Sequence, residues 1–478
     1  MHFKTIFKSF KNKDMLKRIL VILGILVAYR LLAQIPVPMG DASTFKEAVS
    51  NLLEKSDFSN FLNLISGGGL ASFSIILVGL SPYITGSIVI QLLTKAIPSL
   101  EELSNDGETG RRKINQWTRM LTVPLAIVQS IAYIFILYQS TISANVATEF
   151  VPTAGDWILS VTAMTAGSVL LMWMGELITE QGIGNGISTL IFASIISQLP
   201  TTMGSLGSAL FDTSTSGGLN VFGWFEIPVN PTIFWIILGF AVAMLIVIYF
   251  LVKLKEAQRI ITINYAKRVH GNSSYGGIKS ILPIKLIAAG VVPVIFATAF
   301  LSLPALIGQV ITSVDPGNEV GANLVTIFSA PSASNFATQY PDGITAQWFV
   351  YPAMYFLLVF VFTYFYTSII FNTKEIADNL QKQGGFIEGV RPGSKTAEYL
   401  GKVVTRLDLF GALALGLIAM LPFATDYVFI LTTGAPLGLS ISGTGLLIVV
   451  TVALENIRSV DSRALMITYD DFSNEFED

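Results

Sequence analysis

Residues Ile233–Val252 read IFWIILGFAVAMLIVIYFLV, twenty consecutive residues without a single charge. A stretch of about 20 apolar residues is long enough to cross the hydrocarbon core of a bilayer as an α-helix. The rest of the 478-residue chain has the same character, because 52% of its residues are hydrophobic and only 13% are charged. A soluble domain carries about 25% charged residues. The sequence therefore predicts a membrane protein with many spans.

Nine further apolar stretches of similar length occur along the chain, so we predict ten spans. The ten spans are Arg18–Gln34, Ile75–Lys95, Trp117–Tyr138, Ile158–Ile178, Gly186–Met203, Ile233–Val252, Leu286–Val310, Trp348–Phe371, Thr405–Pro422 and Leu437–Ile457. The first span follows a basic tail as a signal peptide would, but no convincing small-residue cleavage site is visible, so we expect it to be retained. The expected fold is an all-α polytopic membrane protein.

The basic residues indicate the orientation of these spans. If ten spans alternate, 26 of the 29 Lys and Arg residues fall on one side and two on the other, while Arg30 lies inside the first span. Cytoplasmic loops carry the excess of Lys and Arg. We therefore expect both termini in the cytoplasm, with a short tail over residues 1–17 and an acidic tail over residues 460–478.

Residues 204–231 divide the chain into two halves of five spans, residues 18–203 and residues 232–459. An odd number of spans gives the two halves opposite orientations. This is the topology of an inverted repeat, in which the functional path lies between the halves. The repeat is predicted from the count alone, because the halves show no clear similarity of sequence.

One apolar segment is too short to span. Phe61–Phe73, FLNLISGGGLASF, has 13 residues and is interrupted by three glycines. Segments of 10–14 apolar residues are more often re-entrant or buried than spanning. Irregular backbone at membrane depth is tolerated only inside protein or beside a water-filled cavity. A half-helix here indicates a cavity on the outer side, and a helix in a surface loop is the alternative.

Residues that carry chemistry are few. The chain has no cysteine and only two histidines, His2 and His270, so we expect no metal site, no catalytic triad and no cofactor. Coupled transporters keep ionisable residues inside their spans. Apart from basic residues at the span boundaries, the candidates here are Arg30, Glu176, Asp408 and Glu455, all predicted near helix ends. Their scarcity disfavours the rival hypothesis of a secondary transporter, and also an intramembrane protease.

Three polar connections contain recognisable patterns. Gly182–Gly186, GIGNG, has the spacing of a dinucleotide motif but lies between two spans, which favours a tight turn. Loop 253–285 alternates from Arg259 to Arg268, which predicts a hairpin strand. Loop 372–404 contains GVRPG, a turn that presents Arg391. Such basic loops suit an acidic protein or RNA phosphate, and charge that only sets the topology is the alternative.

Six stretches carry a further pattern: Pro82–Thr94, Gly110–Val123, Gly182–Ser188, Asn264–Arg268, Ala377–Gly393 and Gly443–Val450. They resemble the SecY family, whose members form the channel of the bacterial protein translocase. They occur in family order and in both halves. The resemblance implies a protein-conducting channel, not an enzyme, that passes unfolded polypeptides across the cell membrane and releases transmembrane segments into lipid. A scaffold that recruits ribosomes and an accessory member with few clients are the alternatives.

The resemblance also implies functional residues. A ring of aliphatic side chains would close the pore at its waist: Leu80, Ile84, Ile191, Ile195, Ile295 and Ile448. The short segment Phe61–Phe73 would be a plug that blocks the outer funnel, and it includes Phe61, Leu64, Ser66, Gly67, Gly68 and Gly69. Gln91 and Thr118 would contribute to a lateral gate. Aliphatic side chains make a narrow seal that excludes water and accept any polypeptide, since apolar contact is not directional.

The basic loops would bind the partner that drives transport, the SecA ATPase or the ribosome. Arg259, Lys267, Arg268 and Arg391 would contact it. The family also pairs the channel with SecE and SecG, and it binds signal sequences, nascent polypeptides and membrane lipids. This chain departs from the family pattern at three places: Ile260 replaces a basic residue, Leu80 replaces the common Ile, and Asp470–Asp478 is acidic.

Overall fold

The structure is a computed structural model of the whole chain. It describes residues 13–38, 69, 72–143, 153–211, 219–221, 225–227, 231–265, 268–270, 273–275, 279–287, 289–290, 292–315, 317–329, 349–433, 445 and 448–463. The chain divides into two compact units. The first unit is Met1–Val242, Ala299–Tyr351 and Thr425–Asp478, and the second unit is Ala243–Thr298 and Pro352–Ala424.

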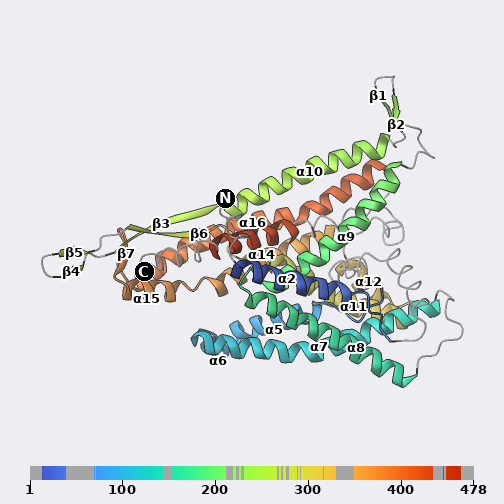
Figure 1. Cartoon of the computed structure of the whole chain (residues 1–478), viewed down its shortest axis with the longest axis horizontal. Helices are drawn as coiled ribbons and strands as arrows, with labels where there is room; N and C mark the ends of the chain where they lie inside the picture. The colour runs from blue at the N-terminus through green and yellow to red at the C-terminus, as the bar shows by residue number, and fades with distance from the viewer. Residues whose placement is uncertain are drawn as a thin grey trace. The chain divides into compact units, whose positions relative to one another are not determined.

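The first unit holds most helices of the N-terminal half. They are α2 (Lys13–Leu32), α5 (Ser81–Ala96), α6 (Pro98–Asn105), α7 (Gly107–Ser143), α8 (Ala154–Glu180) and α9 (Gly186–Phe211). The unit also contains the hairpin of β1 (Leu219–Val221) and β2 (Phe225–Ile227), helix α12 (Glu319–Phe328), and a helix over residues 448–463. Helices α7 and α8 pack against each other (Figure 1).

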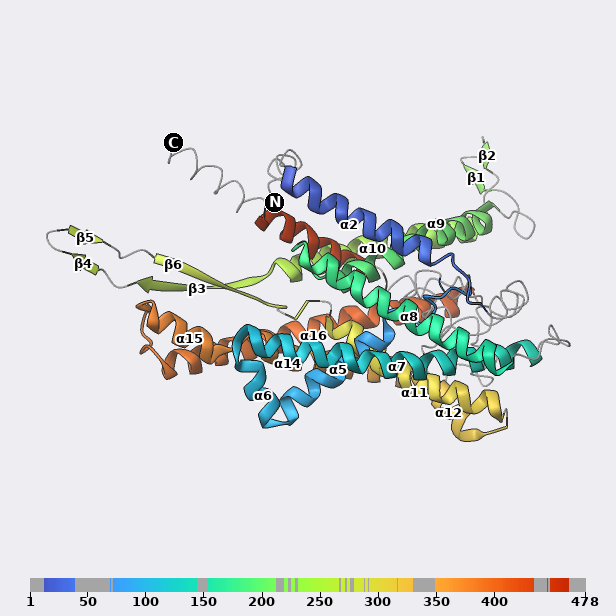
Figure 2. The same ribbon diagram turned by 60° about the horizontal axis from the view of Figure 1, so that its bottom comes forward.

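The second unit combines helices with a small sheet. Its elements are β3 (Gln258–Tyr265), β4 (Arg268–His270), β5 (Ser273–Tyr275), β6 (Lys279–Lys285), α15 (Thr373–Lys382) and β7 (Gly385–Ile387). It also holds most of α10 (Pro231–Glu256), α14 (Val350–Ile370) and α16 (Ser394–Thr433), and the start of α11 (Val292–Val314). The predicted hairpin strand is confirmed, because β3 pairs antiparallel with β6 (Figure 2).

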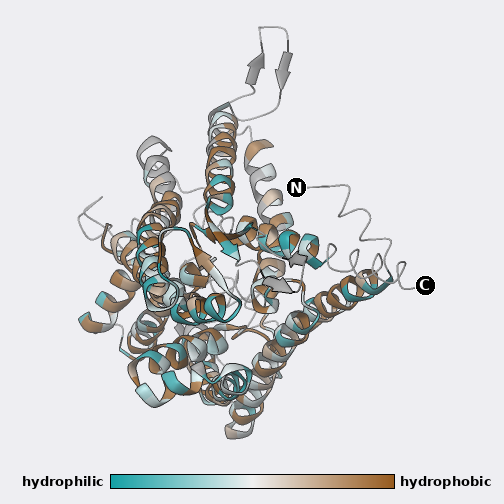
Figure 3. Ribbon diagram, turned by 90° about the vertical axis from the view of Figure 1, so that its left-hand side faces the viewer, coloured by the Kyte–Doolittle hydropathy of each residue, from teal (hydrophilic) through white to brown (hydrophobic). Residues whose placement is uncertain are grey.

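The helices have the composition of membrane spans (Figure 3). Within the described residues, six helices are long and apolar enough to cross a membrane, and a seventh joins them if α5 and α6, bent by 108°, form one span. All ten predicted spans overlap a described helix. Large apolar side chains such as Leu245 and Phe410 are 66% exposed, as expected where lipid replaces water. The fold is an all-α polytopic membrane fold.

Two helices extend well beyond the predicted spans. Helix α7 begins at Gly107, ten residues before the predicted Trp117, and α16 begins at Ser394 rather than Thr405. Both extensions are polar and basic, so hydropathy alone could not reveal them. As a result Asp408 lies well inside α16 and not near a helix end as predicted.

The second predicted span contains irregular backbone. Residues 75–80 are not helical, and α5 begins only at Ser81. Gly79 has a φ of 62°, a left-handed conformation that interrupts a helix. Pro82 lies in the first turn of α5, where its missing N–H costs nothing. These two residues explain why the apolar run begins six residues before the helix.

Candidate functional site

The first two predicted ring residues lie at the start of α5. Leu80 is the N-cap residue, and its carbonyl accepts a hydrogen bond from the Ile84 N–H at 3.0 Å. Four residues apart on a helix, the two side chains share one face. Both are buried, with 3% and 4% of their surface exposed.

The other predicted ring residues are buried as well. Ile191 and Ile195 lie one turn apart on α9 and are 2% and 5% exposed. Ile448 lies among the helical residues 448–463 and is 5% exposed. Ile295, 7% exposed, lies in α11 and belongs to the second unit. The ring itself stays a prediction.

Residues 72–80, which we call the entry segment, hold α5 in place through partners the sequence did not reveal. The carbonyl of Phe73 accepts from the Val37 N–H at 2.9 Å, and the Ile75 N–H donates to the Ile35 carbonyl at 3.0 Å. Phe73 is 1% exposed with a φ of 44°. Such a conformation costs a large side chain free energy, so this packing must hold it there.

Helix α8 provides two further contacts of the entry segment. The Ser168 hydroxyl donates to the Gly79 carbonyl at 2.9 Å, and Ser168 is 1% exposed. A Cβ at Gly167 would lie 2.2 Å from the Ile75 carbonyl oxygen. Only glycine permits that approach. Neither residue stands out in the sequence, since small residues occur throughout the spans.

Most of the predicted plug lies outside the described residues. This applies to Phe61, Leu64, Ser66, Gly67 and Gly68. Gly69 is described, and its carbonyl accepts a hydrogen bond from the Ser74 N–H at 2.8 Å. The last residues assigned to the plug, Ser72 and Phe73, are therefore part of the entry segment.

The predicted gate residues lie on two helices that pack together, α5 and α7. Gln91 donates through Nε2 to the Ser87 hydroxyl at 2.9 Å, and its Oε1 is buried with no partner in the described part of the chain. Thr118, 5% exposed, donates to the Ile114 carbonyl at 3.1 Å. The two side chains thus bond within their own helices.

The second unit contains the predicted binding residues. The sheet has the strand order β6-β3-β7, and its inner face packs through Ile261, Ile284, Ile387 and Leu400. Its outer face exposes Ile260 by 53%, Ile281 by 59% and Phe386 by 38%. Arg259 is exposed on β3. Lys267 lies outside the described residues, and only the backbone of Arg268, on β4, is described.

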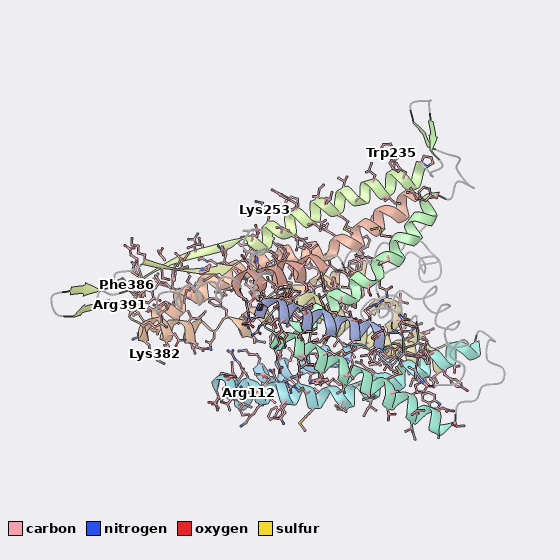
Figure 4. All side chains as sticks on the ribbon, in the orientation of Figure 1. Arg112, Trp235, Lys253, Lys382, Phe386 and Arg391 are labelled. Atoms are coloured by element: carbon pink, nitrogen blue, oxygen red, sulfur yellow. The ribbon has the colours of Figure 1, made fainter. Side chains whose placement is uncertain are left out.

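The GVRPG sequence forms the predicted turn. Gly389 and Gly393 have φ values of 79° and 88°, which favour glycine. Between them Arg391 is exposed, while its carbonyl accepts from the Thr396 hydroxyl at 3.0 Å. Figure 4 shows Arg391, Phe386 and Lys382 near one another in this unit. The turn therefore presents a cation on a fixed backbone.

Two ion pairs lie in the first turns of α16, within the predicted loop 372–404. Glu398 accepts from Lys395 and from Lys402, each at 2.9 Å. These charged hydrogen bonds lower the pKa of Glu398 to about 2. Deeper in the same helix, Asp408 is 5% exposed and accepts from the Thr367 hydroxyl at 2.8 Å. Sequence reasoning noticed Asp408 but could not find Thr367, which is 41 residues away.

The GIGNG sequence is a tight turn, as predicted. Gly182 and Gly184 have φ values of 71° and 74°. The Gly182 carbonyl accepts from Arg463 Nε at 3.2 Å, and the Gln181 carbonyl accepts from Arg18 at 2.9 Å. The turn binds two arginines through carbonyls at the C-terminal end of α8, where cations are favoured.

The spans, and the small sheet formed by strands from the two loops 253–285 and 372–404, define a polytopic membrane protein whose polar loops carry a sheet. Comparison with known proteins identifies it more closely. The family model described as SecY matches residues 74–457. The chain belongs to the SecY family.

Named relatives agree along the whole length. A protein translocase subunit SecY of Streptomyces scabiei is 37% identical over 470 residues, which cover 97% of this chain and 98% of the relative. One of Corynebacterium glutamicum is 38% identical over 485 residues, with the same coverage. The chain is therefore a protein-conducting channel subunit rather than an enzyme.

Solved structures share the fold. A protein-conducting channel superposes with a TM-score of 0.61 at 17% identity, over 92% of this chain and 90% of that one. Sec61 in a canine ribosome-channel complex from the endoplasmic reticulum gives 0.57 at 17% identity, with the same coverage. At these identities the likeness concerns the fold alone.

Proposed function

We propose that the chain is the central channel of a Sec translocon in a bacterial plasma membrane, with both termini in the cytoplasm. It passes unfolded polypeptides across the membrane and releases transmembrane segments sideways into lipid. The distribution of basic residues, 26 against two, supports the orientation. Residues 18–203 and 232–459 form the two halves, and residues 204–231 connect them.

The seal of the resting channel is the aliphatic ring. The observation that carries this proposal is that all six members are both aliphatic and buried, with 2–7% of their surface exposed: Leu80, Ile84, Ile191, Ile195, Ile295 and Ile448. A narrow apolar constriction excludes water and therefore ions. It also adapts to any side chain that passes, because apolar contact has no direction.

The plug and the lateral gate complete the channel. Phe61, Leu64, Ser66 and Gly67–Gly69 block the outer funnel, held at their C-terminal end by the entry segment. Gln91 and Thr118 line the gate through which an apolar segment leaves. Its transfer into lipid is favoured by about 25 cal/mol per Å² of apolar surface.

Transport is driven by partners. SecA or the ribosome binds the basic loops through Arg259, Lys267, Arg268 and Arg391, and the exposed Arg391 on its fixed turn supports this. A solved structure of similar fold was seen in a ribosome-channel complex. SecE and SecG complete the membrane complex, and signal sequences, nascent polypeptides and membrane lipids are further ligands.

Ion conductance of the reconstituted channel, with and without residues 61–68, tests the proposal. This deletion leaves the described entry segment intact. We expect the wild type to stay closed and the deletion variant to open intermittently. If both are equally tight while the double variant Leu80→Ser/Ile84→Ser leaks, the plug assignment is wrong and the ring stands. If all three are tight, the pore assignment is wrong.

A further inference from the structure

The approach to α11 in the second unit repeats the approach to α5 in the first. Residues 75–86 read IILVGLSPYITG and residues 286–297 read LIAAGVVPVIFA. Four of the twelve positions are identical, at a constant offset of 211 residues. The two stretches begin spans two and seven, which occupy the same place in their halves. Four identities are too few to stand out in the sequence without the structure.

The described residues of the two stretches share two backbone features. A glycine with positive φ lies two residues before the helix, Gly79 at 62° and Gly290 at 68°. A proline is the second residue of each helix, Pro82 and Pro293. Both helices therefore begin abruptly after an irregular apolar approach.

The anchoring contacts of the approach also correspond. The Ile75 N–H donates to the Ile35 carbonyl at 3.0 Å, just after span one. The Leu286 N–H donates to the Ala257 carbonyl at 2.9 Å, just after span six. Ile75 and Leu286 lie six residues before their helices. The same backbone position is thus tied to the preceding span in each half.

The carbonyl of that same position rests on a glycine of the fourth span of its half. A Cβ at Gly167 of α8 would lie 2.2 Å from the Ile75 oxygen. A Cβ at Gly411 of α16 would lie 2.4 Å from the Leu286 oxygen. Real Cβ atoms do not approach backbone this closely, so any side chain there would displace the approach. In each unit, a glycine on one span therefore lies directly against the backbone that leads into another span.

Nine residues after each anchored carbonyl comes a predicted ring residue, Ile84 or Ile295. We propose that Gly167 and Gly411 are positioning residues that hold these two isoleucines at the height of the seal. This inference rests on the proposed ring. The helix after the approach transmits displacement because its backbone is hydrogen-bonded along its length.

The two units differ at the residue that follows the glycine. Ser168, which follows Gly167, donates to the Gly79 carbonyl at 2.9 Å. Ala412 follows Gly411 and is fully buried. In the first unit, the hydrogen bond from Ser168 therefore supplements the close contact at Gly167. Loss of one buried hydrogen bond shifts a local equilibrium by about two- to tenfold.

The absence of cysteine from the chain makes a clean test possible. Ile84→Cys and Ile295→Cys are made singly in the full chain, purified with its membrane partners and reconstituted. The rate of reaction with a water-soluble maleimide is measured for each. Gly167→Ala and Gly411→Ala are then added to each cysteine variant. Ser168→Ala, with Ser168→Thr as the conservative change, provides a milder displacement should the alanine variants fail to fold.

The expected pattern is crossed. Gly167→Ala and Ser168→Ala raise the labelling of Ile84→Cys by about two- to tenfold and leave Ile295→Cys unchanged, whereas Gly411→Ala does the reverse. Ser168→Thr restores slow labelling. Opening of the whole protein would instead raise both labelling rates with every variant, and that result, like unchanged rates, would overturn the proposal. Ion leak through the Ile84→Ser variant tests the proposed ring separately. If the labelling is crossed but Ile84→Ser does not leak, the two glycines still position the isoleucines, and the proposed seal is wrong.

Discussion

The two approaches, residues 75–80 and the described residues among 286–291, share backbone features but lead from different surroundings. The first follows the predicted plug and is held by Ile35 and Ser168 in an apolar interior. The second follows β6 directly, at the base of a sheet whose outer face exposes Ile260, Ile281 and basic residues. One element thus begins a span behind the proposed plug, and the other begins a span behind the proposed partner-binding loop.

The comparison separates the contacts that hold each approach in place from the effects of the residues around it. Backbone that is irregular and buried must find a partner for each polar group. In both approaches the fit is between a carbonyl and a helix glycine, so equal geometry should give equal energetic effects. The surroundings differ in charge and exposure, so their effects should differ in kind.

The largest expected effect is on stability and should be alike in both units. Gly411→Ala and Gly167→Ala each force a methyl group against a backbone carbonyl, and overpacking of this sort costs about 3 kcal/mol. Thermal unfolding of the purified protein with its membrane partners measures the effect. We expect both variants to melt earlier by a similar amount.

Gly401→Ala is the matched control in α16. Nothing lies within 4 Å of the Cβ that it would add. Alanine favours a helix over glycine by about 0.5–1 kcal/mol, so this variant should be slightly more stable than the wild type. A large loss at Gly411 with none at Gly167 would mean that the two approaches are not equivalent.

The second effect is on the seal. A hydroxyl in place of a buried aliphatic group stabilises hydrated states by about 1–3 kcal/mol, so Leu80→Ser/Ile84→Ser should raise ion conductance about tenfold or more. Conductance of the reconstituted channel measures this.

Ile260→Ser/Ile281→Ser is the control from the second unit. It removes as much apolar surface from the exposed face of the sheet. We expect conductance to stay at the wild-type level. Equal leak from both double variants would show that the conductance reports disruption of the protein and not a seal at α5.

The sequence predicted the fold class and the helical spans because hydropathy is a property of single segments. It also predicted the strand at β3 and the turns at Gly182–Gly186 and Gly389–Gly393, since these depend on local alternation and on glycine. Sequence reasoning failed where contacts with residues distant in the chain determine the backbone conformation. The non-helical residues 75–80 are as apolar as a helix, and their partners Ile35 and Ser168 lie some 40 and 90 residues away.

The candidate site divides along the same line. Leu80, Ile84 and the other ring members were assigned by resemblance, because a buried isoleucine in a channel looks like any other in the sequence. Gly167 and Gly411 were not assigned at all. Each matters because a backbone carbonyl, that of Ile75 or Leu286, lies against it, and no local sequence pattern predicts that contact.

The third effect concerns binding of the driving partner. Arg391→Glu reverses an exposed charge, and such a charge acts chiefly on the association rate and its salt dependence. We expect polypeptide transport into vesicles to slow severalfold at low salt, with conductance and stability unchanged.

Arg112→Glu, at an exposed cation that pairs with Glu108 at 2.7 Å, is the matched control. It should slow transport less. An equal loss in both variants would indicate a general requirement for positive charge, and would reduce the turn at Arg391 to one contribution among many.

The smallest effect is expected at Glu398, beside that turn. Lys395 and Lys402 lower its pKa from 4.5 to about 2, so the ionised form is favoured in the folded protein. The stabilisation is therefore present above pH 4.5 and is lost as the pH falls toward 2. Because the pairs are exposed and screened by salt, Glu398→Gln should barely change the melting temperature at neutral pH. The small difference from the wild type should shrink with added salt and with acid. A large difference that survives salt would mean that the first turn of α16 is held by these charges and not, as the buried Leu400 indicates, by its apolar contact with the sheet.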